Sequence, residues 1–323
     1  MESSRGGRDR RRRRRRRGRR RPLLYAALVA VVIGGVTAGG TVYVKARAHD
    51  GGRAVSSAAS PSASAPAVEE EASVEPVTRS AAVDRTTLLR RAMEAVDLPS
   101  GAAVSAAVLD LDSGQSAVYG EADFATASIV KVDILAALLL RAQDEGRRLT
   151  AAEKAYAVKM IEASDNASAS ALWHVIGGAD GLDAANKRFG MTGTSAGADG
   201  LWGLTRTTAK DQLALLRQVF GDDSLLSTAS RAYLRELMES VNADQRWGVS
   251  AAAEGGTTAL KNGWLPRSTT GLWVVNSIGR IRAAAGTFYL VAVLSSGTAS
   301  QAKGISLVES AAGAAVSAFT RDT

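Results

Sequence analysis

The hydrophobic pattern of residues 82–323 changes twice along the chain, from strand to helix and back to strand. After a helical spacing of apolar residues in 82–96, residues 102–121 are typical of two strands joined by an Asp-Ser-Gly turn. Helical spacing follows in segments 128–145, 151–161, 167–176 and 208–220. Strand patterns return at 257–263, 272–281 and 287–296, before a closing helix over 299–319. This order predicts one sheet built from both ends of the domain, with a helical insertion between them.

Positive charge is concentrated in residues 1–21, which contain 13 of the 40 basic side chains. The whole chain of 323 residues has a net charge of +8, but residues 22–323 hold 27 basic and 30 acidic side chains. A domain without a basic excess lacks the electrostatic footprint of a nucleic-acid binder, so we expect no nucleic-acid partner. A hydrophobic fraction of 46% is enough for a sizeable core.

Residues 22–44 form a run of 23 uncharged residues directly after the arginines. A helix of that length spans the roughly 30 Å hydrocarbon core of a bilayer. By the positive-inside rule, the tail 1–21 stays in the cytoplasm and the C-terminal domain lies outside. The alternative is a secreted protein after signal cleavage, since residues 46–48 have the A-x-A form. The apolar run exceeds the usual length of roughly 7 to 15 residues, which favours a retained single-pass anchor.

Residues 45–81 form a low-complexity segment. They are rich in Ser, Ala, Pro, Gly and Glu without an apolar period, which predicts a disordered linker before a folded domain over 82–323.

Residues that commonly bind metals are scarce. The chain has no cysteine, which excludes disulfides, lipid attachment through cysteine, and cysteine-based metal sites. With only His49 and His174 as histidines, we expect no metal and no cofactor.

Three short motifs occur in order within the predicted domain. The first is Ser-x-x-Lys at Ser128 and Lys131; about 0.8 such pairs are expected by chance, and a second at 300–303 fits the N-cap of the last helix. The second is Ser-Asp-Asn at 164–166, for which chance gives only about 0.03. The third is Lys-Asn-Gly at 261–263, at the end of a strand pattern.

Ser128 and Lys131 can act together if the segment that follows them is helical. Positions i and i+3 share a helix face, and the free N–H groups at a helix start favour a developing anion. A reactive serine needs a base, and because His174 is the only histidine of the domain, Lys131 is the available one. Burial and a second cation, Lys261, would favour the neutral amine. The alternative is a capping serine beside a lysine that reaches solvent.

The ordered motifs resemble the active-site signature of class A β-lactamases and penicillin-binding proteins. The resemblance covers residues 82–323 and implies an α+β fold: a five-stranded antiparallel sheet flanked by helices, with an inserted helical subdomain and a cleft between the two. It also implies two sets of site residues: catalytic Ser128, Lys131, Ser164 and Lys261, and substrate-binding Asn166, Asn262, Gly263 and Trp264.

The same resemblance assigns a role to each residue. Ser164 would relay a proton, and Lys261 would supply positive charge toward a substrate carboxylate. Asn166 would hold an amide of the substrate, while its neighbour Asp165 would be structural. The backbone N–H groups of Ser128 and Trp264 would form the oxyanion hole.

The chain departs from the family pattern in two places. Class A β-lactamases carry a glutamate that activates water for deacylation, but residues 188–212 contain none, and Asp199 is the acid nearest the expected place. Asn262 replaces the usual Thr or Ser, so we expect its amide N–H to substitute for the hydroxyl toward a substrate carboxylate. Trp264 adds bulk at the edge of the cleft.

These observations predict a membrane-anchored, extracytoplasmic serine hydrolase that is acylated by β-lactams or D-Ala-D-Ala-like peptides and deacylates slowly. Its expected partners are a small-molecule or peptidoglycan-peptide substrate and the membrane, and its ectodomain is expected to be monomeric. The alternative is a catalytically weak or inactive module on the same fold, which would bind peptidoglycan or a protein partner in the cell envelope.

Overall fold

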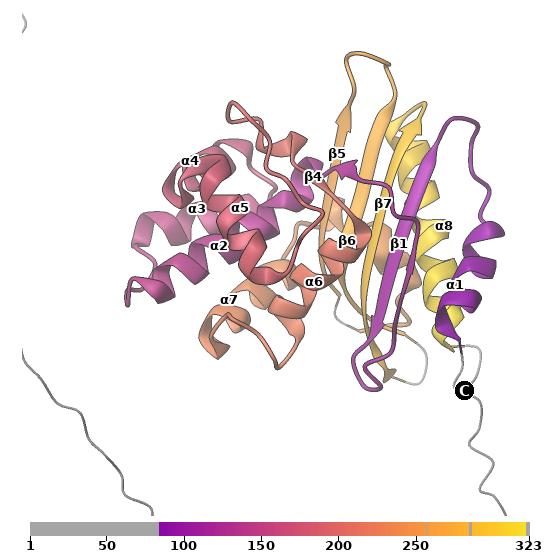
Figure 1. Ribbon diagram of the computed structural model, residues 1–323, viewed down its shortest axis with the longest axis horizontal. Helices are drawn as coiled ribbons and strands as arrows, with labels where there is room; N and C mark the ends of the chain where they lie inside the picture. The colour runs from indigo at the N-terminus through magenta and orange to yellow at the C-terminus, as the bar shows by residue number, and fades with distance from the viewer. Residues whose placement is uncertain (1–83, 257, 284–285, 321–323) are drawn as a thin grey trace, which may run out of the picture. The chain divides into compact units, whose positions relative to one another are not determined.

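The computed structural model describes residues 84–256, 258–283 and 286–320, all within the unit Pro76–Thr323 (Figure 1). The predicted tail 1–21, anchor 22–44 and linker 45–81 lie outside the described residues. Among the helices that are described, none combines the length and the apolar character that a membrane crossing requires.

A five-stranded antiparallel sheet is built from both ends of the domain, which confirms the predicted α+β architecture (Figure 1). The strand order is β2-β1-β7-β6-β5, so the last strand in sequence lies at the centre and β5 lies at one edge. The strands are β1 (Ala103–Asp110), β2 (Ser116–Tyr119), β5 (Ala259–Pro266), β6 (Trp273–Arg282) and β7 (Phe288–Thr298). The predicted hairpin 102–121 therefore forms β1 and β2.

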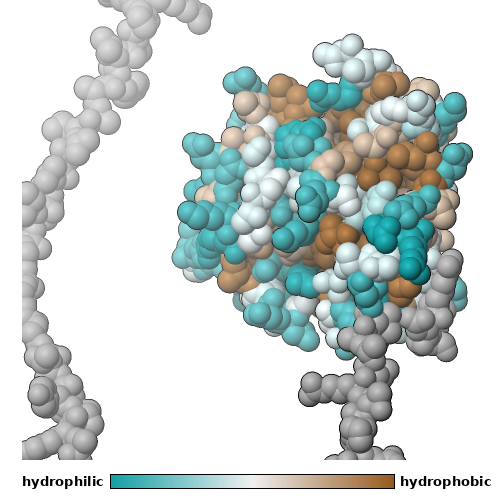
Figure 2. Space-filling view, turned by 45° about the vertical axis from the view of Figure 1, so that its right-hand side comes forward, coloured by the Kyte–Doolittle hydropathy of each residue, from teal (hydrophilic) through white to brown (hydrophobic). Residues whose placement is uncertain are grey.

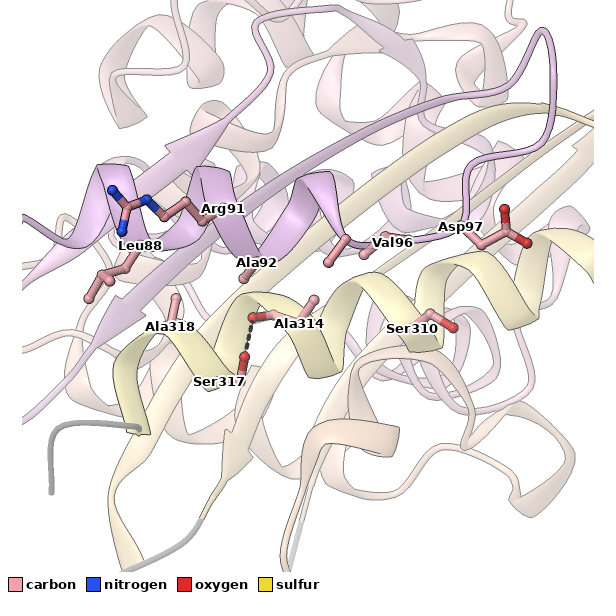
Figure 3. Close-up of a pocket in the computed structure, with 10 residues that line it drawn as sticks. Leu88, Arg91, Ala92, Val96, Asp97, Ser310, Ala314, Ser317 and Ala318 are labelled. Atoms are coloured by element: carbon pink, nitrogen blue, oxygen red, sulfur yellow. Dashed lines mark hydrogen bonds between the residues drawn. The ribbon is translucent and has the colours of Figure 1, made fainter.

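Helices cover both faces of the sheet (Figure 1). On one face, α1 (Arg85–Glu94) packs against α8 (Gln301–Thr320), and Figure 3 shows the groove between these two helices, which contains none of the predicted site residues. Ser300 accepts a hydrogen bond from the N–H of Lys303 at 3.2 Å, which confirms it as the cap of α8. On the visible face of the domain, hydrophobic patches lie among hydrophilic residues (Figure 2), while a large cluster of hydrophobic side chains is buried in the core.

The other face is covered by the helical insertion between β2 and β5 (Figure 1). Its elements are β3 (Phe124–Ala125), η1 (Ala127–Ile129), α2 (Val130–Asp144), α3 (Ala151–Glu162), α4 (Asn166–Ile176), α5 (Gly178–Phe189), η2 (Trp202–Leu204), β4 (Arg206–Thr207), α6 (Ala209–Phe220), α7 (Thr228–Glu239), η3 (Ala243–Gln245) and η4 (Gly248–Ala252). The helix α2 is central: 12 of its 15 residues are buried, which explains why this stretch is apolar on every side.

Two helices, α5 and α7, lie outside the predicted helical segments. The helix α5 begins at Gly178, and both Gly178 and the N-cap residue Gly177 have positive φ. Its Gly181 packs on the end of α4, where a Cβ would lie 1.8 Å from the carbonyl oxygen of Ile176. The close packing of α5 on α4 requires glycine, and glycine lowers helix propensity. The sequence of α5 therefore lacks the helical signal that would have predicted it.

The buried acid Asp133 links α2 to α5. Burial raises the pKa of Asp133 to about 8, a hydrogen bond from Asn186 opposes this shift, and the charges of Asp183 and Asp211 add to it. With its amide nitrogen turned toward Asp133, Asn186 lies 2.8 and 3.1 Å from the two carboxyl oxygens. The folded protein therefore keeps a proton that the unfolded chain releases.

We predict that the stability of the protein falls as the pH rises from about 4 to about 8, because the unfolded state binds fewer protons than the folded state over this range. Asp133→Asn should flatten the melting temperature between pH 5 and 8 and raise it at pH 8 relative to the wild type. Asp144→Asn, on the exposed end of the same helix, is the control and should keep the wild-type slope. Parallel curves for wild type and Asp133→Asn would contradict the assignment.

Candidate active site

The nucleophile candidate, Ser128, lies in the tight turn η1 at the start of α2. Ala127, which precedes it, has a φ of 49°, a left-handed conformation that is costly for a residue with a Cβ. The turn is held from β6, where the buried amide of Asn276 donates to the carbonyl oxygens of Ala125 and Thr126 at 2.9 and 3.0 Å. The sheet thus fixes the backbone from which Ser128 projects.

Lys131 lies one turn after Ser128, and its Nζ is 3.0 Å from the Ser128 Oγ. The lysine is completely buried, with 0% exposure, whereas Ser128 remains partly accessible. The predicted i, i+3 pair therefore forms, and the alternative of a lysine that reaches solvent is wrong. An amine placed at this distance can accept the hydroxyl proton when it is neutral.

Ser164 lies between two lysines. Its Oγ is 3.1 Å from the Nζ of Lys131 and 3.0 Å from the Nζ of Lys261. Lys131 also donates to the carbonyl oxygen of Ser164 at 2.5 Å and to the Oδ1 of Asn166 at 2.7 Å, and Lys261 donates to the carbonyl oxygen of Asn262 at 2.9 Å. A continuous chain of polar atoms therefore connects Ser128 to Lys261.

The electrostatics of this chain disfavour two charged amines. Burial lowers the pKa of Lys131 to about 8, and the nearby carboxylate of Asp165 opposes this shift. Burial also lowers the pKa of Lys261 well below its usual range, and the charge of Lys131 lowers it further. We expected Lys261 to supply positive charge toward a substrate. Since its side chain is completely buried, with 0% exposure, the site instead favours a neutral Lys261 that acts as a hydrogen-bond partner of Ser164.

The middle motif is held by the end of a helix. Asp165 is the N-cap of α4 and accepts the N–H of Ser168 at 2.7 Å, which agrees with the structural role expected for it. Ser164 has a φ of 55°, so the turn before α4 is strained like the one before α2. Asn166 is exposed at the first position of α4, next to Lys131, where its amide can meet a ligand.

Gly263 allows the edge strand β5 to approach the nucleophile. A Cβ at this position would lie 2.6 Å from the N of Ser128, 2.7 Å from the N of Ile129 and 2.8 Å from the O of Thr126. The role of Gly263 is therefore close backbone contact, and it brings β5 beside the N–H of Ser128. The oxyanion hole formed by the N–H groups of Ser128 and Trp264 stays a prediction.

Asn262 does not have the role that we expected for it. Its side chain is 1% exposed, and its amide N–H groups donate to the carbonyl oxygens of Gln245 and Trp247 at 2.8 and 2.9 Å. No amide N–H is left for a substrate carboxylate, because the side chain ties β5 to the segment between η3 and η4. Trp264, a residue of β5, is partly buried and packs against Trp247, with ring centroids 5.7 Å apart.

Trp202 is the site residue that sequence reasoning missed. Its ring centroid is 5.1 Å from the Nζ of Lys131, and its Nε1 donates to the Oγ of Ser170 at 3.1 Å. It lies in the loop that contains Asp199, and Ala127, Ser164 and Asp199 are the three non-glycine residues with positive φ in the described chain. The strained positions thus gather in the segments around Lys131. The only sequence signal was an aromatic residue between glycines in a loop without periodicity.

The described residues contain no group of three or more His, Asp or Glu side chains arranged to hold a metal ion. The groups that meet at the site are two hydroxyls, two amines and the surrounding amides.

Fold and site together define the class of the β-lactamases and penicillin-binding proteins. The family model of the "Beta-lactamase enzyme family" matches residues 153–319, just over half of the chain, and the match begins after Ser128 and Lys131. The chain belongs to this family.

Similar proteins fall into two groups. The candidate lipoprotein LppW, from Mycobacterium tuberculosis and from Mycobacterium bovis, is 30% identical over 173 residues, which is 51% of this chain and 55% of LppW. The chain thus spans about half the length of these relatives. Among solved structures, PBP-A is 22% identical with a TM-score of 0.63, covering 73% of this chain and 97% of PBP-A. The TLA-1 extended-spectrum β-lactamase is 16% identical with a TM-score of 0.65, covering 72% and 99%.

We predict that Gly263→Ala destabilises the protein by about 1 to 3 kcal/mol, because the added methyl group would overlap backbone atoms of η1 that cannot move independently. Gly313→Ala is the matched control: position 313 is exposed in α8 with no atom within 4 Å of an added Cβ, and alanine there should stabilise by about 0.5 to 1 kcal/mol. Urea denaturation measures both. Equal effects of the two substitutions would refute the close approach of β5.

Proposed function

We propose that this protein is a membrane-anchored, extracytoplasmic serine hydrolase that is acylated at Ser128 by β-lactams or D-Ala-D-Ala-like peptides. The observation that carries the proposal is the 3.0 Å contact between the Ser128 Oγ and the buried Nζ of Lys131. A primary amine in this position is a base for the hydroxyl when it is neutral, and burial favours the neutral form.

Acylation would proceed through a single chain of proton transfers. As the Oγ of Ser128 bonds to the carbonyl carbon of the substrate, Lys131 takes the hydroxyl proton, and the carbonyl oxygen becomes an oxyanion near the N–H of Ser128. When the C–N bond breaks, the leaving nitrogen needs a proton. Ser164 can supply it from its hydroxyl and be reprotonated by Lys131, which carries the proton taken from Ser128 and contacts the Ser164 Oγ. The neutral Lys261, on the other side of the same Oγ, would orient the hydroxyl.

Substrate binding would use the groups that face the nucleophile. The amide of Asn166 is exposed beside Lys131 and can hydrogen-bond an amide of the substrate. Trp264 lies on the strand that approaches Ser128 and would form one wall of the cleft. Because Asn262 is already bound to backbone carbonyls, it contributes to this site by holding β5 in place.

Slow deacylation is proposed because residues 188–212 contain no glutamate to activate a water molecule. The same segment instead places the ring of Trp202 over Lys131. A variant of the similar structure PBP-A has been captured as an acyl-enzyme complex with penicillin G, which supports a long-lived adduct in a protein of this fold.

The proposed location follows from the N-terminal sequence. Residues 22–44 are long enough to span a bilayer, and the arginines before them favour a cytoplasmic N-terminus. The similar protein LppW is described as a candidate lipoprotein, which supports a family member held at the membrane from outside. The present chain has no cysteine for a lipid, so the apolar segment would take over the anchoring.

We predict that a fluorescent penicillin labels the detergent-solubilised full-length protein once, at Ser128. Peptide mapping should locate the adduct, and the loss of label after removal of free penicillin should take far longer than turnover by an efficient β-lactamase. Label on another residue, or none after prolonged incubation, contradicts the proposal.

Lys131→Arg should slow labelling by at least about a hundredfold, since a guanidinium cannot accept a proton near neutral pH. The second Ser-x-x-Lys motif provides matched controls: Ser300→Ala and Lys303→Arg lie on α8 and should label like the wild type. Unchanged labelling of Lys131→Arg would exclude Lys131 as the base. If Ser128→Ala retains the biological function, the alternative of a non-catalytic envelope-binding module is favoured instead.

We predict that the full-length chain sediments with membranes of a bacterial host and resists extraction with alkaline carbonate, because residues 22–44 would span the bilayer. Intact mass should include residues 1–21. A soluble product whose mass begins near residue 49 would instead support cleavage after the A-x-A sequence.

A further inference from the structure

Trp202 packs at the margin of the hydrophobic core and covers the amine of Lys131. It is only partly buried, and its neighbours Leu201 and Leu204 are 55% and 37% exposed. The centroid of its ring lies 5.1 Å from the Nζ of Lys131, and Lys131 is completely buried. Contact with the core buries part of the indole, but the ring also lies over a buried amine, which is the feature that calls for an explanation.

The loop that carries Trp202 is folded tightly to place it. Asp199 and Gly200 have φ values of 53° and 73°, and a Cβ on Gly197 would lie 2.2 Å from the carbonyl oxygen of Leu201. The end of the loop is tied to the nucleophile turn, because the N–H of Thr126 donates to the carbonyl oxygen of Thr205 at 2.8 Å. Backbone strain and direct attachment together fix the ring relative to Ser128 and Lys131.

A hydrogen bond fixes the orientation of the ring. The indole Nε1 donates to the Oγ of Ser170 on α4, the helix that begins with Asn166. The indole is therefore held between two elements, its own loop and α4, both of which border the amine. An aromatic ring oriented in this way presents its face to Lys131 and excludes water from that side.

We propose that Trp202 is a positioning residue for Lys131: its ring keeps water from the amine, which holds Lys131 ready to accept the proton of Ser128. This inference rests on the proposed role of Lys131 as base. The other charged groups that face Lys131 are Lys261 from β5, connected through Ser164, and Asp165 from the turn before α4. The exposed Asp199 belongs to the Trp202 loop itself.

Two effects of the ring oppose each other. A cation–π contact stabilises the charged amine, whereas exclusion of water destabilises it. Burial is the dominant influence and lowers the pKa of Lys131 to about 8. Removal of the ring should therefore admit water and raise the pKa of Lys131 toward its ordinary value of 10.5.

The test compares the titration of Lys131 in the full-length wild type with that in Trp202→Ala and Trp202→Phe. The direct readout is the NMR titration of lysines labelled with ¹³C at Cε, in which the Lys131 signal is assigned by its loss in Lys131→Arg. The second readout is the pH at which the acylation rate by penicillin reaches half of its maximum. Trp273→Phe, on β6, controls for the loss of a tryptophan.

In Trp202→Ala we expect both midpoints to rise by about one pH unit or more, with acylation at pH 7 about tenfold slower. Trp202→Phe keeps a ring over the amine and should stay within about 0.3 units of the wild type. An unchanged or lowered midpoint in Trp202→Ala overturns the proposal. If the wild type is not acylated, the proposed function fails, but the NMR midpoint still decides whether Trp202 controls Lys131.

Ser170→Ala keeps the proposal testable should Trp202→Ala fail to fold. It removes only the acceptor of the indole N–H, so we expect a smaller upward shift of the Lys131 midpoint, with the same melting cooperativity as the wild type. A Ser170→Ala protein whose Lys131 midpoint equals that of the wild type would refute the inference.

Discussion

The arrangement of the candidate active site depends on one hydroxyl group, which lies between two buried amines. The Oγ of Ser164 is 3.1 Å from the Nζ of Lys131 and 3.0 Å from the Nζ of Lys261. Two ammonium groups without exposure, joined through one hydroxyl, would have a large desolvation cost and would repel each other. At least one amine is therefore favoured in its neutral form, and a neutral amine 3.0 Å from the Ser128 Oγ is what nucleophile activation requires.

The fold brings these atoms together from three regions of the chain. Ser128 and Lys131 come from the start of the buried helix α2, Ser164 from the turn before α4, and Lys261 from the edge strand β5. The close approach of β5 depends on Gly263, and Asn262 fastens the same strand to the segment before η4. The helical insertion and the sheet are thus joined at the site itself, so that packing energy holds the amines in a position they would not adopt in water.

Local geometry and motif order were readable from the sequence, but long-range packing was not. The pairing of Ser128 with Lys131 follows from their i, i+3 spacing at the start of one helix. The order of strand and helix patterns along the chain predicts a single sheet built from both ends of the domain. The role expected for Asn262 failed because the partners of a side chain on an edge strand depend on a segment 15 to 17 residues earlier in the chain. Trp202 was missed because an irregular loop has no period from which its direction could be inferred.

Neutron diffraction from crystals of the deuterated protein at pH 9 would test the central claim most directly, because it locates the deuterons on the amine. We expect two deuterons on the Nζ of Lys131 and the hydroxyl deuteron of Ser128 directed toward that nitrogen, since burial lowers the pKa of Lys131 to about 8. Three deuterons on Lys131 at pH 9, with the Ser128 hydroxyl pointing elsewhere, would contradict the assignment of this lysine as the base.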